Sequence, residues 1–167
     1  MARIVVLFDM KRVHKDGVDL DCEGASADRF DALVAAQGHT TASAIQWYGS
    51  AGDIEWLDAG NEDITESVVT PYSNFFDTEY ALWKQEMKEA ALNQSAETLA
   101  KMERNSLLAK TDWWATSDRT MTDDQRAYRQ ALRDLPASPN WSPRMSWVED
   151  EEIAVVVGVT WPIKPLD

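Results

Sequence analysis

The segment 122–136 constrains the fold most, because both of its ends carry the signals of helix ends. Thr122 can cap free backbone amides, while the side chain of Gln125 reaches back and completes a capping box. Acidic residues follow this start, arginines lie near the other end, and Pro136 cannot continue the helical hydrogen bonds. Helical spacing predicts one buried stripe, formed by Ala127, Tyr128, Ala131, Leu132 and Leu135, and one polar face, formed by Arg126, Arg129 and Gln130.

A second helix precedes this one and ends near the Thr-Asp-Trp-Trp cluster at 111–114, so a polar turn joins the two into a helical hairpin. Four residues of the hairpin have two interpretations. In the structural one, Asp112 caps the turn and Trp113 plugs the hairpin, while Arg133 and Asp134 lock the helix end to neighbouring backbone. In the other, these residues contact a partner, because buried Trp and bidentate Arg occur both in cores and in binding hot spots. Neither interpretation makes them catalytic.

Three motifs in fixed order resemble those of the tail-fibre assembly chaperones of tailed bacteriophages. They are RNSLLAKTDW, then QRAYRQALRDLP, and a closing WPIKP at 161–165, which together cover about one third of the chain. The resemblance implies a non-enzymatic phage tail protein that binds a tail fibre or receptor-binding protein and assists its folding, trimerisation or attachment. Fibres built from intertwined strands fold slowly and expose sheet edges, which is why such a helper is useful. In the usual family pattern the Trp-Pro tail follows RDLP closely, whereas residues 137–160 intervene here with an extra pair of expected strands.

The candidate partner-binding residues are aromatic, charged and proline residues of the hairpin and of the tail. They are Trp113, Trp114, Tyr128, Arg133, Asp134, Trp161, Pro162 and Pro165. The two prolines of the tail cannot donate hydrogen bonds and favour an extended polyproline shape. Such a segment can lie in an aromatic groove at little ordering cost.

Two other functions stay open at this point. The chain could be a permanent virion component, such as a tail-fibre or baseplate adaptor or cap, or a small hydrolase that acts on the host envelope. A chaperone would work in the host cytoplasm during phage assembly, whereas an adaptor would stay in the virion tail. Self-association is a further possibility beside binding to a fibre.

The charge of the chain argues against two classes of partner. The net charge is −13, and binding to nucleic acid or to an anionic membrane needs clustered Lys and Arg. Residues 1–70 hold 13 acids and 5 bases, so a partner of this segment is expected to be neutral or basic. The apolar stretch at 4–8 is too short for a signal peptide or a membrane helix.

No pattern for catalysis or metal binding is found in the sequence. His14 and His39 are the two histidines, and neither stands at a metal-ligand spacing from the single cysteine, Cys22. Both histidines are expected to be solvated loop residues, and Cys22 is expected to be a small side chain in or near a loop. A single cysteine excludes an internal disulfide framework and fits a reducing cytosol. We therefore expect no enzyme activity, no cofactor and no metal.

The sequence pattern of the N-terminal part predicts a small module with a β-hairpin. A strand at 4–8, buried on both faces, precedes a polar loop at 9–24 and a helix at 27–36 that Ser26 caps and Gly38 ends. Residues 44–48 and 53–57 flank a four-residue loop, which predicts a half-buried hairpin with Gln46 and Glu55 on the polar face. The passage AIQWYGSAGDIEW resembles the small N-terminal β module of some of these phage proteins, and residues 61–64 are expected to be a turn.

From Pro71 the composition changes to that of a long amphipathic helix, with a break near 93–95. Its apolar stripe is Tyr72, Phe76, Tyr80, Trp83, Met87 and Ala91, and the stripe continues after the break with Leu99, Met102, Ser106, Ala109 and Trp113. The C-terminal region predicts a loop at 136–140, a short strand at 145–148, an acidic turn at 149–152 and a strong strand at 153–160. The expected fold is α+β, with an N-terminal β-hairpin module at 1–70. A helical hairpin with C-terminal strands and an extended Trp-Pro tail is expected at 71–167.

Overall fold

The computed structural model describes residues 2–116 and 120–166 and has the expected α+β fold. The chain divides into two compact units, Met1–Gln85 and Glu86–Asp167. The division falls inside helix α2 (Glu66–Leu92), whereas the sequence suggested a boundary after residue 70. The centre of the expected polar turn, residues 117–119, lies outside the described residues.

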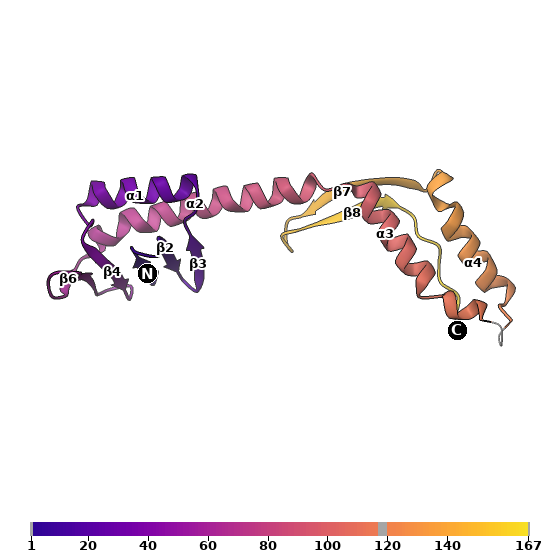
Figure 1. Cartoon of the computed structure of the whole chain (residues 1–167), viewed down its shortest axis with the longest axis horizontal. Helices are drawn as coiled ribbons and strands as arrows, with labels where there is room; N and C mark the ends of the chain where they lie inside the picture. The colour runs from indigo at the N-terminus through magenta and orange to yellow at the C-terminus, as the bar shows by residue number, and fades with distance from the viewer. Residues whose placement is uncertain (1, 117–119, 167) are drawn as a thin grey trace. The chain divides into compact units, whose positions relative to one another are not determined.

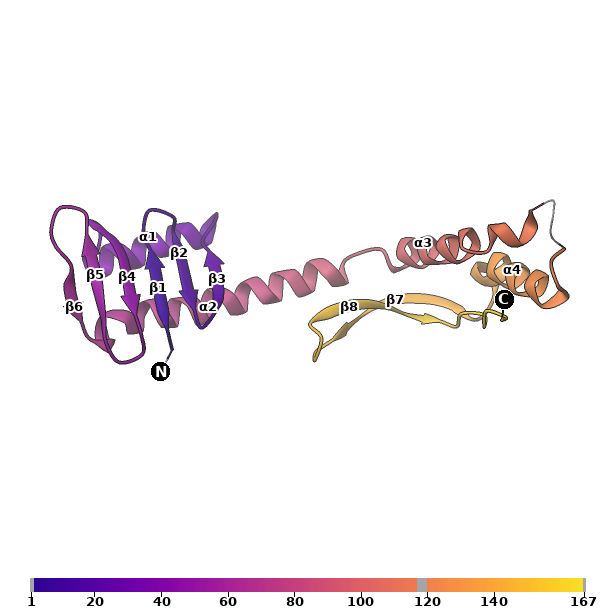
Figure 2. The same ribbon diagram turned by 90° about the horizontal axis from the view of Figure 1, so that it is seen from below.

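The described part of the N-terminal unit contains one antiparallel sheet covered by two helices on the same face (Figures 1 and 2). The strand order is β3-β2-β1-β4-β5-β6. The strands are β1 (Ile4–Leu7), β2 (Arg12–Lys15), β3 (Val18–Asp21), β4 (Ala42–Trp47), β5 (Gly52–Trp56) and β6 (Glu62–Ile64). The covering helices are α1 (Ala25–Gln37) and the first turns of α2.

The core of this unit lies between the helices and one face of the sheet. Val6 pairs with Val13 on one side and with Ile45 on the other, and all three side chains are buried. Phe30 of α1 and Tyr72 of α2 pack against them. The opposite face carries side chains that are only half-buried, so the expectation that the first strand is buried on both faces was wrong. Helices cover this sheet on one side only, and the burial of β1 therefore alternates.

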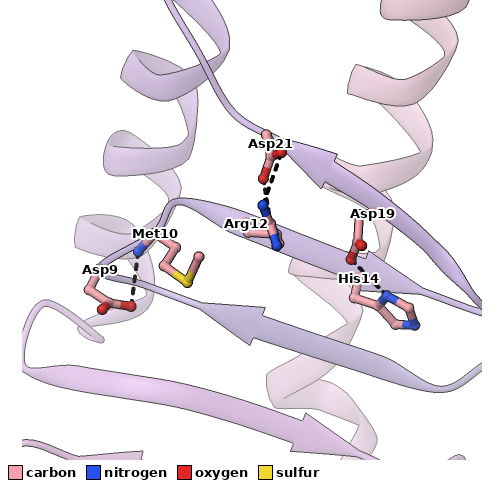
Figure 3. A network of polar contacts seen from close by, with 6 residues as sticks. All are labelled: Asp9, Met10, Arg12, His14, Asp19 and Asp21. Atoms are coloured by element: carbon pink, nitrogen blue, oxygen red, sulfur yellow. Dashed lines mark hydrogen bonds and ion pairs between the residues drawn. The ribbon is translucent and has the colours of Figure 1, made fainter.

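Residues 9–24, which the sequence suggested were a loop, contain the hairpin β2–β3. Its turn holds Asp16 and Gly17 at positive φ (49° and 92°), the backbone that a tight hairpin turn needs. Figure 3 shows how these strands accommodate polar residues, because the polar side chains pair across the hairpin. Arg12 pairs with Asp21, and His14 Nδ1 lies 2.8 Å from Asp19 Oδ1. The pattern therefore marked an open, charged sheet face and not a loop.

Other local predictions had mixed outcomes. The β4–β5 hairpin is confirmed, with Gln46 Nε2 donating to Glu55 Oε1 across the open face at 2.7 Å. Gly38 ends α1 in the left-handed conformation, as expected, but α1 begins after Gly24 and Ser26 does not cap it. Residues expected to form a turn at 61–64 include the edge strand β6.

The long helix is confirmed, with two corrections. α2 begins at Glu66, so Pro71 lies inside the helix and does not start it. After the break, α3 (Ala96–Ala109) begins with Ser95 as its N-cap. Only the first part of its aromatic stripe is buried, because Trp83 and Met87 are about half exposed at 48% and 53%. In α3 the expected stripe is also displaced: Ala100 is the buried residue, and Met102 is 62% exposed.

The described C-terminal unit combines a helical hairpin with a strand pair. α3 is followed by a 3-10 turn η1 (Asp112–Ala115), helix α4 (Asp123–Asp134), a 3-10 turn η2 (Leu135–Ala137) and strands β7 (Trp141–Val148) and β8 (Ile153–Val159). The capping box of Thr122 and Gln125 and the acidic turn before β8 are confirmed. β7 begins earlier than expected, because a register shift between Trp141 and Arg144 accommodates Pro143 within the strand.

The expectation of solvated loop residues was wrong for His14, which lies in a strand, and for the solvation of His39, which lies in the loop between α1 and β4 but is half-buried. His14 belongs to β2, and His39 stacks on the ring of Tyr72 with its Nδ1 2.7 Å from the Tyr72 hydroxyl. Burial lowers the pKa of His39 and raises the pKa of Tyr72, since in both cases it disfavours the charged form. Cys22 is also buried, and burial raises the pKa of its thiol.

Acidification is expected to destabilise the N-terminal unit through His39. The unfolded chain takes up this proton near pH 6.5, while the folded protein resists it until the pH is lower. The stability is therefore fully present above pH 6.5 and is lost as the pH falls through the folded-state pKa. The melting temperature should fall between about pH 7.5 and about pH 5.5, and it should fall less in a His39→Gln variant. Equal slopes for the two proteins would contradict this account.

Candidate partner-binding surface

The helical hairpin of the C-terminal unit closes around one aromatic cluster. Trp114, Tyr128 and Leu132 are buried, and Leu107, Leu108, Met121 and Trp161 pack against them. Trp114 and Tyr128 meet edge to face, with their ring centroids 6.0 Å apart. Aromatic pairs in this geometry contribute beyond the area they bury. The cluster forms the seam between the two helices, and it contains Tyr128 and Leu132 of the stripe that the sequence predicted.

Trp114, and not Trp113, is the residue that plugs the hairpin. Trp114 is fully buried, whereas Trp113 is 45% exposed. Both belong to η1, and consecutive side chains of a 3-10 helix point about 120° apart, so only one of them can face the seam.

Arg129 lies inside the hairpin, although the sequence suggested that it belonged to the polar face. It is 7% exposed, and its guanidinium donates to the carbonyl oxygen of Leu108 at 3.0 Å and to Thr111 Oγ1 at 2.7 Å. Its other terminal nitrogen binds Asp112 Oδ1 at 2.8 Å, so Asp112 serves this contact. The buried face of α4 is therefore Gln125, Tyr128, Arg129 and Leu132, and Ala127 and Ala131 are exposed.

The C-terminal tail docks on this hairpin even though the strand pair separates the two in sequence. Trp161 packs against the aromatic cluster and meets Trp141 edge to face at 6.2 Å. The indole N–H of Trp141 donates to Glu97 Oε2 of α3 at 2.8 Å. Lys164 Nζ lies 5.5 Å from the centre of the Trp114 ring, within cation–π range. Figures 1 and 2 show the tail running from β8 to the α3–α4 hairpin.

In the docked tail, each proline is more buried than the aliphatic residue that follows it. Pro162 and Pro165 are half-buried, whereas Ile163 is 93% exposed and Leu166 is 98% exposed. The tail thus presents two large aliphatic side chains to solvent from a segment that Trp161 holds in place.

Residues 97–166 match the family model of the phage tail assembly chaperone protein. This confirms the resemblance seen in the sequence motifs for the part of the chain that holds the hairpin, the strand pair and the tail. The matched region is less than half of the chain, and the N-terminal unit lies outside it. No curated protein matches the sequence, and no solved structure matches the chain.

Within this chaperone-like region, the predicted binding residues fall into two groups. Trp114, Tyr128 and Trp161 come together in the hairpin cluster, and Pro162 and Pro165 flank it half-buried. The exposed group is Trp113, Arg133 and Asp134, and the Asp134 carboxylate accepts from Gln130 Nε2 at 2.9 Å.

Sequence reasoning missed four residues that shape the surface: Arg129, Met102, Ile163 and Leu166. For the tail a signal existed, because an aliphatic residue follows each of its two prolines. For Arg129 and Met102 the signal is only in the tertiary contacts.

The phenol of Tyr128 lies in the aromatic cluster of the hairpin. Burial raises the pKa of Tyr128, so its phenol stays neutral at physiological pH. Across residues 2–116 and 120–166, no three His, Cys, Asp or Glu side chains are placed to hold a metal ion. In the same ranges, every helix is too short or too polar to cross a membrane.

Replacing Arg129 by Met should destabilise the C-terminal unit by about 2 kcal/mol, because the Leu108 carbonyl and the Thr111 hydroxyl lose a buried donor. The matched control is Arg126→Met on the same helix. Arg126 pairs with the exposed Asp123, and its loss should change stability by less than about 0.5 kcal/mol. Urea unfolding followed by tryptophan fluorescence measures both. Similar losses in the two variants would show that the buried contacts of Arg129 are not what holds the hairpin.

Proposed function

We propose that this chain is a non-enzymatic phage tail protein that binds the tail fibre or the receptor-binding protein. It assists the folding, trimerisation or attachment of that partner, in the host cytoplasm during phage assembly. The observation that carries the proposal is the docked tail, on which Ile163 and Leu166 are 93% and 98% exposed. The family match at 97–166 supports the same function.

The docked tail suits the capture of an apolar partner surface for an energetic reason. A large aliphatic side chain contributes about 1.5–3 kcal/mol when it moves from water into an apolar contact. A flexible segment would lose much of this gain in ordering, at about 0.5–1.5 kcal/mol for each immobilised side chain. Trp161 and Lys164 already hold the tail against the hairpin, which lowers that cost.

The segment 1–70 would act as a second contact module in this proposal. Its 13 acids and 5 bases favour a neutral or basic partner segment. The open sheet face carries part of this charge, including Asp53 and Glu55 of β5. Residues 71–167 would supply the apolar contacts of the hairpin and tail.

Fibre protein produced without this chain should accumulate as insoluble material, and co-production of the chain should bring it into solution. The physical reason is that strand-rich fibre chains expose apolar edges before they trimerise. The measurement is the soluble fraction of fibre and its yield of trimer, with and without the chain. A fibre that folds equally well alone would remove the basis for a chaperone.

The exposed face of the tail should be required for this effect. A double variant, Ile163→Ser with Leu166→Ser, should weaken co-purification with the fibre and leave the melting temperature unchanged, because both side chains are in solvent. The matched control is Leu57→Ser, which removes a side chain that is 74% exposed in the N-terminal unit. If the control weakens binding as much as the double variant, the tail is not the specific contact.

A further inference from the structure

Four strands form the open edges of the two sheets in the described chain, and they differ in how they are protected. An open edge carries unpaired backbone groups and invites another strand, so natural edges are short, charged or interrupted by proline. β3 has four residues, among them Asp19 and Asp21. β6 has three residues and begins with Glu62 and Asp63. Both edges of the six-stranded sheet are therefore short and acidic.

The two edges of the strand pair contrast with each other. β7 carries Pro143 and Arg144 at its register shift, which interrupts its outer edge. β8 has seven residues, Ile-Ala-Val-Val-Val-Gly-Val, with no charge and no proline. Its one strand neighbour among the described residues is β7 (Figure 1). β8 is thus the long apolar edge that carries neither charge nor proline, and its irregular position is Gly158 (φ 82°), opposite the register shift of β7.

We propose that the free edge of β8 pairs with β8 of a second copy of this chain. The two β8 strands run antiparallel about a two-fold axis at Val156. They join the β7–β8 pairs of the two copies into one four-stranded sheet. In this register Val156 faces its own copy, Val155 faces Val157, and Ile153 faces Val159. A two-fold contact requires a surface that is complementary to itself, and an uncharged aliphatic strand meets this requirement.

The charges at the two ends of β8 favour the antiparallel arrangement. The acidic turn 149–152 precedes the strand, while the Arg144 guanidinium lies over Gly158 near its other end. Antiparallel pairing brings the acidic turn of each copy toward the Arg144 end of the other. It also separates the two acidic turns by about 20 Å, the length of the strand. Parallel pairing would place the two acidic turns side by side, where like charges repel.

The contact is small for a protein interface. A single strand pair buries less than the roughly 1,200–2,000 Å² of a standard stable complex. Association is therefore expected to depend on protein concentration, with monomer and dimer in exchange. This inference does not rest on fibre binding, because it concerns the purified chain alone.

The first test is the molar mass of the purified full-length protein by light scattering over a range of concentrations. The expected result is a rise from 18.8 kDa toward twice that value. Ile153→Lys should raise the concentration for half-dimerisation about tenfold or more, since an edge lysine opposes strand addition. The control is Met87→Lys, on an α2 side chain that is 53% exposed, compared with 43% for Ile153. A monomer at every concentration, a trimer, or equal effects of the two variants would overturn the proposal.

The second test reads the register and does not depend on a destabilising charge. In a Cys22→Ala background, Val156→Cys should form a disulfide-linked dimer under mild oxidation, because the two-fold axis brings this position against itself. Ile153→Cys should not link to itself, but it should link to Val159→Cys when the two proteins are mixed. Self-linking at 153 in preference to 156 would overturn the register. A strand of the fibre bound along β8, with no dimer in its absence, would overturn the proposal itself.

Discussion

The contacts of Arg129 are the constraint on which the C-terminal unit depends. A buried guanidinium is stabilised by acceptors for its donors, and here the two terminal nitrogens bind the Leu108 carbonyl, Thr111 and Asp112, while the buried Nε has no hydrogen-bond partner among the described residues. The acceptors lie at the end of α3 and the start of η1, so satisfying Arg129 closes α4 against both elements. It also sets the rotation of η1. With Asp112 held by Arg129, Trp114 faces the seam and Trp113 faces solvent. One polar contact set thus decides which tryptophan is core and which is surface.

The position of Trp114 in turn determines where the tail can lie. Its ring offers one edge contact to Tyr128 and a face to Lys164, and the cluster leaves room for Trp161 at its border. The tail is consequently held by an aromatic contact and a cation–π contact, with few requirements on its backbone. Such anchoring suits a proline-containing segment, which lacks some backbone donors but keeps its extended shape without them. Ile163 lies between these two anchors and Leu166 follows the second one, and both side chains face solvent.

Features that a few neighbouring residues satisfy could be predicted from the sequence, and features that need a distant partner could not. Thr122 and Gln125 complete each other across three residues, and Gly38 alone supplies the left-handed end of α1. The β2–β3 hairpin was missed because its strands are polar. Arg12 and His14 look like loop residues until Asp21 and Asp19 are placed across from them. Arg129 was missed for a related reason: its helical position next to Tyr128 is compatible with burial, but the acceptors that permit burial come from another helix. The exposure of the tail likewise depends on where Trp161 docks.

The placement of charge along the strands explains why one edge differs from the others. The chain has many more acids than bases, and acids stand on β3, on β6 and in the turn before β8. β8 itself has none, although a single charge would protect its edge at little cost to a strand whose first residue is 43% exposed. The packing of β8 against α3 and β7 does not explain why every residue of β8 is uncharged. Its residues are half-buried at most, so some of these positions could hold polar side chains without burying them. A partner strand explains this uncharged, apolar strand better than packing within the β7–β8 pair does. The acidic turn 149–152 before β8 also disfavours parallel pairing, in which two such turns would lie side by side.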